Sequence, residues 1–360
     1  MLIKEVYAVK VWQIATGELG RDYRELFFAH DIMILGPSHT GRVTGDATKY
    51  SYAGGTPNSA YSQVHSFAYN PSSGDRVIMR FGKTVIGVGQ IPQDGKYFYD
   101  ETFKHVYGWD LAHCRRVIWA SSSCDLGVLG NVFSGASKIP SFTQVLREEV
   151  VKEVQNIDNS HFARSPKDMP KIDTSEYKET DLGVELFRAG ISNKNIEDIL
   201  KALQQASRLC SWYRSGHSGR KPSESEIISH SILPLFLGLG WSHQQIAVEW
   251  NRVDMAFFKN TPTMSENCVM VLEAKELGRA LSEVLRQPIA YVEDLKLKNV
   301  KYILTTDGEN LFVYGKNGDK WESNSNPIGY ISVSSLQKNY ILPKGTNLVD
   351  TLVMLQPSSM

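Results

Sequence analysis

The chain has 360 residues, of which 42% are hydrophobic, 22% charged and 10% aromatic, and its 39 Lys and Arg residues balance its 39 Asp and Glu residues. This composition excludes wholesale disorder and a fibrous repeat, and the length predicts two or three domains. Because the formal charges cancel, any nucleic-acid contact must come from a local basic surface and not from the net charge.

The four cysteines, Cys114, Cys124, Cys210 and Cys268, form no CxxC pair and no finger-like spacing with histidine. They argue against a disulfide scaffold and structural zinc, and they fit a reducing cytoplasm. The longest apolar stretch, residues 232–241, is about half of what a bilayer requires and contains one proline and two glycines. We therefore expect a cytoplasmic protein without a membrane segment.

Residues 1–140 are predicted to form a mostly β domain. They are rich in glycine, aromatic and β-branched residues, and strand-like runs such as VYAVKVWQIA, DRVIMRFG and KTVIGVGQI alternate with turn clusters. The polar, glycine-rich span 41–60 is typical of a long loop.

Residues 141–220 are predicted to form a helical connector. The run FTQVLREEVVKEVQNI has helical spacing, and a charged stretch containing prolines follows it. Ser192 or Asn193 can cap a helix over residues 196–213, whose apolar residues occupy one face.

Residues 221–360 are predicted to form an α/β domain. Ser223 can cap a helix that ends at the glycines 238 and 240. The strand-like runs QIAVEW, RVDMAFF and CVMVLEAK follow, then a helix over about 279–296, then KYILTT and NLFVYG joined by an Asp307-Gly308 turn. The expected order of the core is therefore helix, three strands, helix and strand.

Three charged residues interrupt the apolar strands of this last domain. Asp254 lies in RVDMAFF, and Glu273 and Lys275 end CVMVLEAK. Since strand residues two apart share a face, a hairpin can bring Asp254 beside the other two. Two neighbouring carboxylates either share a proton or hold a divalent cation, and oxygen ligands favour Mg²⁺ or Mn²⁺ over zinc. We therefore expect Asp254 and Glu273 to be metal ligands.

Two further residues are predicted to face the same site. Glu224 begins the preceding helix on the stripe that also carries Ile228 and Leu235, with Glu226 as the competing choice. Gln287, in the helix after the second strand, can hydrogen-bond the lysine or a phosphate, with Tyr291 one turn further on. A metal in this setting would support phosphodiester hydrolysis, with Lys275 orienting the attacking water or stabilising the transition state.

These segments resemble the PD-(D/E)XK nuclease superfamily, most closely the N-terminal nuclease domain of type I restriction enzyme motor subunits. The likeness covers residues 221–320 and rests on the series SESEIISHSILPLFLGLGW, RVDMAFF, LEAK, RQPIAY and TTDGENLFVY. It implies a catalytic set around Mg²⁺ or Mn²⁺ that consists of Glu224, Asp254, Glu273, Lys275 and Gln287. No Walker motif is present, so ATP is not an expected partner.

The first domain carries many aromatic residues with arginines between them, which suits base stacking, although a small β-barrel also needs aromatic residues in its core. The stretches WQIATGELGRDYRELFF and GDRVIMRFGKTVIGVGQI resemble a PUA-like barrel of the EVE, YTH and ASCH kind. This resemblance covers residues 1–120 and implies a pocket for a modified base. The candidate base-binding residues are Trp12, Tyr23, Trp109 and His113.

These readings together predict a Mg²⁺-dependent DNA endonuclease that restricts foreign DNA, with the first domain reading a modified base. Cutting both strands needs two active sites, so a homodimer is expected. Three alternatives stay open: Asp254 and the ExK residues as an exposed ion pair at a sheet edge, a non-cleaving binder of modified nucleic acid, and an RNA-directed nuclease.

Overall fold

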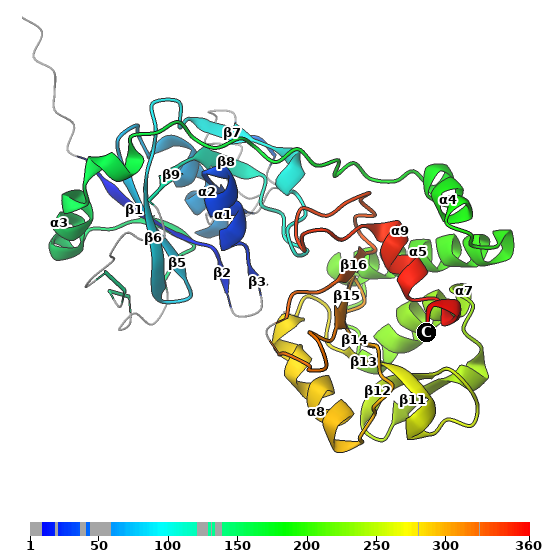
Figure 1. Ribbon diagram of the computed structural model, residues 1–360. Coiled ribbons are helices and arrows are strands. Elements are labelled where there is room, and N and C mark those ends of the chain that lie inside the picture. Colours follow the sequence, from blue (N-terminus) through cyan, green and yellow to red (C-terminus); the bar gives the residue numbers. More distant parts are fainter. Residues whose placement is uncertain are drawn as a thin grey trace, which may run out of the picture. The chain divides into compact units, whose positions relative to one another are not determined.

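The computed structural model is a mixed α/β protein whose chain divides into two compact units, Met1–Lys171 and Ile172–Met360 (Figure 1). The structure describes residues 9–18, 21–36, 41–43, 59–120, 129–130, 132–133, 139–279, 281–323 and 325–360. The loop expected over 41–60 and Cys124 therefore lie largely or wholly outside the described residues.

Unit 1 contains a five-stranded sheet, a three-stranded sheet and a short two-stranded ribbon. The five-stranded sheet has the order β10 (Phe142–Gln144), β1 (Val11–Ala15), β5 (Arg76–Phe81), β6 (Thr84–Gln90), β9 (Ile118–Trp119). The others are β4 (Ile32–Leu35), β8 (His113–Arg116), β7 (Tyr97–Tyr99), and the ribbon β2 (Gly17–Glu18), β3 (Arg21–Asp22). Since β8 and β9 are separated only by Val117, the chain passes directly from one sheet into the other.

Three α-helices accompany these sheets: α1 (Arg24–His30), α2 (Ser59–Tyr69) and α3 (Glu148–Asn156). Val150 and Val154 of α3 are buried in the same apolar cluster as Ile78 and Val88 of the five-stranded sheet. The expected β-rich first part of the chain is thus confirmed, and α3 belongs to its core.

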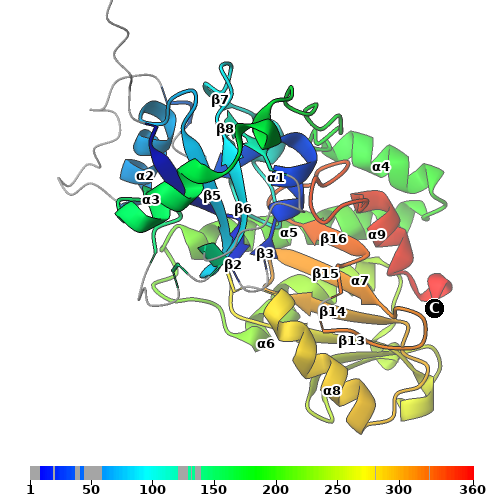
Figure 2. The same ribbon diagram turned by 60° about the vertical axis from the view of Figure 1, so that its left-hand side comes forward.

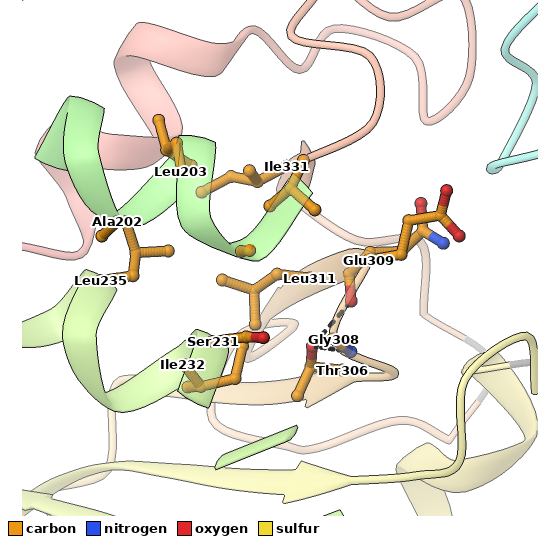
Figure 3. Close-up of a pocket in the computed structure, with 13 residues that line it drawn as sticks. Ala202, Leu203, Ser231, Ile232, Leu235, Thr306, Gly308, Glu309, Leu311 and Ile331 are labelled. Atoms are coloured by element: carbon orange, nitrogen blue, oxygen red, sulfur yellow. Dashed lines mark hydrogen bonds between the residues drawn. The ribbon is translucent and has the colours of Figure 1, made fainter. Parts of the chain in front are cut away.

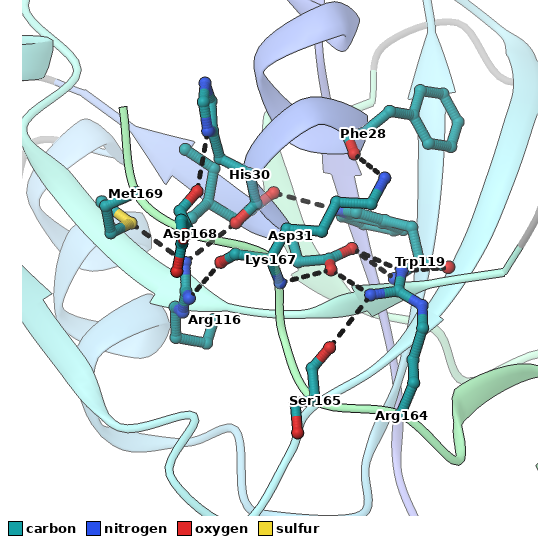
Figure 4. Close-up of polar contacts among 11 residues, drawn as sticks. Phe28, His30, Asp31, Arg116, Trp119, Arg164, Ser165, Lys167, Asp168 and Met169 are labelled. Carbon is teal, nitrogen blue, oxygen red and sulfur yellow. Dashed lines mark hydrogen bonds and ion pairs between the residues drawn. The ribbon is translucent and has the colours of Figure 1, made fainter. Parts of the chain in front are cut away.

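The segment 164–169 is tied back to unit 1 by polar contacts (Figure 4). The carboxylate of Asp31, which is fully buried, accepts hydrogen bonds from the Arg164 guanidinium and from the backbone N–H of Lys167 at 2.9 Å. Arg116 donates to the carbonyl oxygen of Lys167 and to the sulfur of Met169. These contacts explain why unit 1 extends to residue 171.

The boundary differs from the expected three-part division. The predicted connector 141–220 is split between the units, because α3 and the 164–169 segment bind unit 1 while the next two helices pack into the core of unit 2. The connector's amphipathic helices each have a sheet to cover, and this is the physical reason why they do not form a separate body.

Unit 2 is built on a six-stranded sheet with the order β11-β12-β13-β14-β15-β16. The strands are β11 (Ile246–Trp250), β12 (Val253–Phe258), β13 (Cys268–Ala274), β14 (Tyr302–Thr306), β15 (Asn310–Gly315) and β16 (Gly329–Ser332). Only β13 and β14 are parallel neighbours; every other adjacent pair is antiparallel. A parallel pair needs a crossover, and α8 (Arg286–Asp294) supplies it between these two strands (Figure 2).

The remaining helices of unit 2 are α4 (Glu179–Arg188), α5 (Asn193–Arg214), α6 (Glu224–Ile227), α7 (Leu233–Gly238) and α9 (Leu348–Met354), with a π-helical turn at Ile228–Ile232 between α6 and α7. Their apolar residues share one buried cluster with Met255, Phe257, Met270 and Leu272 of the sheet. One face of β12 and β13 is therefore covered by helices.

The expected elements of unit 2 are confirmed with small shifts. Ser192 caps α5, accepting a hydrogen bond from the Asn195 N–H at 3.3 Å, and Gly308 has the positive φ of 85° that the tight Asp307-Gly308 turn requires. The α-helix expected to begin near residue 279 begins at Arg286, after a 3₁₀ turn at Ser282–Leu285. Pro288 fits there because the first helical turn does not need its missing N–H.

Among the described residues, no helix combines the length and the apolar character that crossing a bilayer demands.

Candidate functional site

Asp254 and Glu273 lie on neighbouring strands and share one face of the sheet of unit 2. The register pairs Met255 with Leu272, which sets Asp254 of β12 opposite Glu273 of β13. Met255 and Leu272 point into the helix-covered core, so the two carboxylates point to the other face. The hairpin geometry expected from the sequence is confirmed.

Lys275 lies between two carboxylates just beyond the end of β13. Its ammonium Nζ donates to Oε1 of Glu273 at 2.6 Å, and it lies 3.5 Å from Oε1 of Glu224. Glu273 is only 1% exposed, and its other oxygen, Oε2, is buried and has no hydrogen-bond partner among the residues that the structure describes. Burial of a carboxylate oxygen without a hydrogen-bond partner costs free energy. A cation or proton bound at this atom would recover that free energy.

Burial dominates the electrostatics of this carboxylate. It raises the pKa of Glu273 to about 7, with help from the charges of Asp254 and Glu224, although the hydrogen bond from Lys275 opposes the shift. Burial alone would lower the pKa of Lys275, but Glu273, Glu224 and Asp254 outweigh it and raise that pKa. Near neutral pH, Glu273 is therefore poised to exchange a proton while Lys275 stays charged.

Asp254 is held by the backbone of the neighbouring strand. Its Oδ2 accepts a hydrogen bond from the N–H of Ala274 at 2.7 Å. Burial raises the pKa of Asp254, and the charges of Glu224 and Glu249 act in the same direction against the effects of Ala274 and Lys275. The carboxylate is therefore oriented by strand pairing and sits in a field that favours a bound cation or proton.

The structure separates the roles of the two acids at the start of α6. Glu224 faces Lys275, whereas Glu226 closes a capping box with Ser223 and forms an ion pair with Arg220 at 2.5 Å. The hydrogen bonds of Arg220 and Ser223 lower the pKa of Glu226 to about 2. Glu224 is thus the acid at the site, and Glu226 stabilises the helix start.

Gln287 is not among the side chains that contact Lys275 or Glu273 in the described residues. Its Nε2 donates to the hydroxyl oxygen of Tyr291, one turn further along α8, at 2.9 Å. The side chain is exposed. Gln287 thus bonds Tyr291, and the expected hydrogen bond to the lysine is not formed among the described residues.

Glu249 is a candidate residue that the sequence analysis missed. The strands pair Val248 with Met255 and Trp250 with Val253, so Glu249 of β11 lies near Asp254, and its charge helps to raise the pKa of Asp254. The run QIAVEWNRVD carries the signal, because a two-residue turn after Trp250 fixes this pairing.

Asp307, in the turn between β14 and β15, is the second missed residue. It is fully buried, accepts a hydrogen bond from the Gly278 N–H at 3.0 Å and binds its own turn through the N–H of Asn310 at 2.7 Å. The Lys275 N–H bonds the carbonyl oxygen of Thr306 at 2.7 Å. The β14–β15 turn and the end of β14 therefore hold the backbone at Lys275 and Gly278 in place.

A small cavity lies on the helix-covered face of the same sheet (Figure 3). It holds about 10 Å³, the volume of one water, between α5, the π-helical turn and the β14–β15 turn. Its lining is mostly apolar and includes Leu203, Leu235, Leu311 and Ile331. This cavity is too small for a substrate and opens on the opposite face from Glu273.

In unit 1, Trp12 packs in the core and is not placed to bind a base. Its ring is 2% exposed and stacks on Phe142 with centroids 5.3 Å apart, and its Nε1 donates to Asp75 at 2.8 Å. A ring stacked on one side and anchored at its only polar atom belongs to the core. Trp12 is therefore not a wall of an open pocket.

The other three candidates of unit 1 differ in exposure. His113 is fully buried, with Nδ1 bonded to the hydroxyl of Tyr97 at 2.9 Å, and Tyr23 is 7% exposed beside Phe27. Trp109 is 36% exposed. Of the four predicted base-binding residues, Trp109 alone presents a large part of its ring to solvent.

The carboxylate oxygens at the unit 2 site could supply some, but not all, of the ligands of a hard cation. The unpartnered Oε2 of Glu273 and the opposing carboxylate of Asp254 are oxygen ligands of the type that Mg²⁺ and Mn²⁺ prefer. Within the described part of the chain, however, no three His, Cys, Asp or Glu side chains are close enough to enclose a metal by themselves. A cation here would keep open coordination positions for water or substrate, as catalytic sites require.

Comparison with known proteins adds no relative: no family model and no curated protein matches this chain.

Proposed function

We propose that the chain is a Mg²⁺- or Mn²⁺-dependent endonuclease that hydrolyses phosphodiester bonds of DNA. The observation that carries the proposal is the contact of Lys275 with Glu273 and Glu224, beside Asp254. One buried oxygen of Glu273 has no hydrogen-bond partner in the part of the chain that the structure describes. The order of the elements, helix, three strands, helix and strand, supports the resemblance to the PD-(D/E)XK nucleases.

Asp254 and Glu273 would hold the cation. When bound, the cation would polarise the scissile phosphate and lower the pKa of a water. Lys275 would stay charged and stabilise the negative charge that develops on the phosphate, because its carboxylate neighbours raise its pKa. Glu224, at the rim of the site, would orient Lys275 or accept a proton from water.

The PUA-like resemblance of unit 1 supports modification-dependent restriction as the biological use. Trp109 is the candidate for contact with a flipped modified base, since its ring is partly exposed beside the polar Asp110. A homodimer, or pairing of two copies on DNA, would supply the two active sites that a double-strand cut needs.

The test is digestion of a panel of phage genomes with different base modifications, in Mg²⁺ and in Mn²⁺, by the full chain and by the Asp254→Ala variant. Glu276→Gln is the matched control, because Glu276 is exposed and follows Lys275 directly. We expect the unaltered chain and the control to cut and Asp254→Ala to leave the DNA intact. Intact DNA in every reaction with the unaltered chain would refute the endonuclease proposal.

The alternatives predict different results in the same assay. A non-cleaving binder of modified nucleic acid would retain DNA without cutting it, and Lys275→Ala would change nothing. An RNA-directed nuclease would cleave labelled RNA in preference to DNA when the two compete.

A further inference from the structure

A basic surface precedes the candidate site in the chain. Between Ile199 and Ser223 the sequence holds five Lys and Arg residues and no Asp or Glu, a local charge of +5 in a chain whose net charge is zero. The five are Lys201, Arg208, Arg214, Arg220 and Lys221, and all are exposed. We call residues 201–221 the basic segment.

Helix α5 presents part of this charge in a row. Lys201, Arg208 and Trp212 are exposed and are separated by seven and four residues, so they lie along one side of the helix. Trp212 is 47% exposed and packs against Tyr213 with ring centroids 4.9 Å apart. Trp212 follows Arg208 by one helical turn, so the helix presents an aromatic ring beside a cation on this side.

The charges of the row are available to a ligand. In the part of the chain that the structure describes, Lys201 and Arg208 have no carboxylate partner. By contrast, Arg214 is paired with Glu309 and Arg220 with Glu226, and these pairs fix the end of the basic segment to unit 2. A backbone that is already ordered and carries unpaired cations can bind phosphates with little loss of conformational entropy.

The basic segment ends at the candidate site. Ser223, directly after it, caps the helix that begins with Glu224. Lys221 Nζ lies 4.0 Å from the carboxylate of Glu276, the residue that follows Lys275. A strand of nucleic acid that follows the basic segment would therefore be led to the Glu273–Lys275 pair.

We propose that the basic segment is the surface on which unit 2 binds the phosphate backbone of DNA, with Trp212 contacting a base or sugar. Lys201 and Arg208, which have no carboxylate partner among the described residues, complement the phosphates, and the indole adds a stacking contact that a simple counterion surface lacks. The inference rests on the proposed function for the choice of DNA, and it deepens that function by naming the binding surface.

Anisotropy of a fluorescent DNA duplex of about 30 base pairs tests the proposal, with salt varied to count phosphate contacts. The full chain carrying Glu273→Gln serves as the parent, so that binding is measured without cleavage. Arg208→Ala should raise Kd about 3- to 10-fold and reduce the slope of log K against log salt by about one. Trp212→Ala should raise Kd about 5-fold or more.

Lys298→Ala is the matched control, because Lys298 is an exposed cation of the same unit that lies outside α5 and the basic segment, before β14. It should leave Kd and the salt slope unchanged. Kd values for Arg208→Ala and Trp212→Ala equal to that of the control would overturn the inference, as would a parent that binds no DNA or prefers RNA of the same sequence.

The two proposals fail separately in these experiments. If the unaltered chain cuts DNA while Arg208→Ala and Trp212→Ala bind normally, the proposed binding surface is refuted and the endonuclease proposal is supported. If DNA binding depends on Arg208 and Trp212 while neither Mg²⁺ nor Mn²⁺ supports cleavage, the proposed binding surface is supported and the endonuclease proposal is refuted.

Discussion

Unit 1 and unit 2 each contain a deeply buried carboxylate, Asp31 and Glu273, and the surroundings of these two differ. Asp31 in unit 1 is surrounded by donors: the Arg164 guanidinium and the backbone N–H groups of Lys167 and Trp119. Burial would raise its pKa, but these donors outweigh burial and lower it. Glu273 in unit 2 accepts a hydrogen bond from one ammonium on Oε1, its Oε2 has no partner within the described ranges, and its pKa is raised.

The contrast shows how a structural acid differs from a candidate functional one. A carboxylate that is fully hydrogen-bonded fixes the chain, as Asp31 fixes the 164–169 segment, and it has no capacity left for a ligand (Figure 4). A carboxylate that is buried with an unsatisfied oxygen costs stability, and such a cost is typical of sites that bind a cation or proton in function.

The largest expected effect is on cleavage by Lys275→Ala. Removal of the ammonium should lower the rate at least about 100-fold, because one preorganised donor at a developing charge contributes this much. Lys298→Ala, which removes an exposed cation of the same unit, should keep the full rate in single-turnover assays on the preferred DNA. Equal rates for the two variants would contradict the assigned role of Lys275.

Stability should respond in opposite directions to neutral substitutions of the two acids. Asp31→Asn leaves Arg164 without its buried partner and should lower the free energy of unfolding of unit 1 by about 2–3 kcal/mol. Glu273→Gln removes a poorly solvated charge and should leave unit 2 unchanged or more stable at pH 8.

Urea unfolding followed by circular dichroism, analysed for two separate transitions, measures both changes. Asp94→Asn, an exposed acid of unit 1, is the control for Asp31. A destabilising Glu273→Gln would remove the distinction between the two acids.

The raised pKa of Glu273 also predicts a pH dependence. A carboxyl whose pKa rises from 4.5 to about 7 on folding binds a proton in the native state, so the stability of unit 2 should fall as pH rises through this window. The thermal midpoint of unit 2 in chelator should fall between pH 5 and pH 8, and the fall should be smaller in Glu273→Gln. Parallel profiles for the two proteins would show that another group titrates.

The smallest expected effect distinguishes the two acids of α6. Glu224→Gln should lower the cleavage rate several-fold without changing the thermal midpoint of unit 2, because Glu224 is half-exposed and contacts Lys275. Glu226→Gln should do the reverse, with a cost of about 1 kcal/mol from the weakened helix start. A rate loss confined to Glu226→Gln would exchange their roles.

Much of unit 2 follows from its sequence, and much of unit 1 does not. Alternation and caps predicted the strands and the pairing of Asp254 with Glu273, because a shift of the register by one residue would move the apolar residues out of the core. The partners of Glu273 depend on the exact side-chain geometry around Lys275, which no pattern encodes. Glu249 was missed because an acid near the end of an edge strand looks like an ordinary solvated residue.

The aromatic residues of unit 1 could not be sorted in advance for a similar reason. A ring that packs in a core and a ring that stacks on a base have the same composition and spacing, and only burial separates Trp12 from Trp109. The division of residues 141–220 between the units was also hidden, since an amphipathic helix does not specify which sheet it covers.

The most direct test of the account is a calorimetric titration of the full chain with Mn²⁺ at pH 8. We expect saturable binding that is lost in Glu273→Gln and in Asp254→Asn and is retained in Glu226→Gln, the neighbouring acid that serves the helix cap. Equal Mn²⁺ affinity in Glu273→Gln, or no Mn²⁺ binding by the unaltered chain, would contradict the proposed role of Glu273 as a cation ligand.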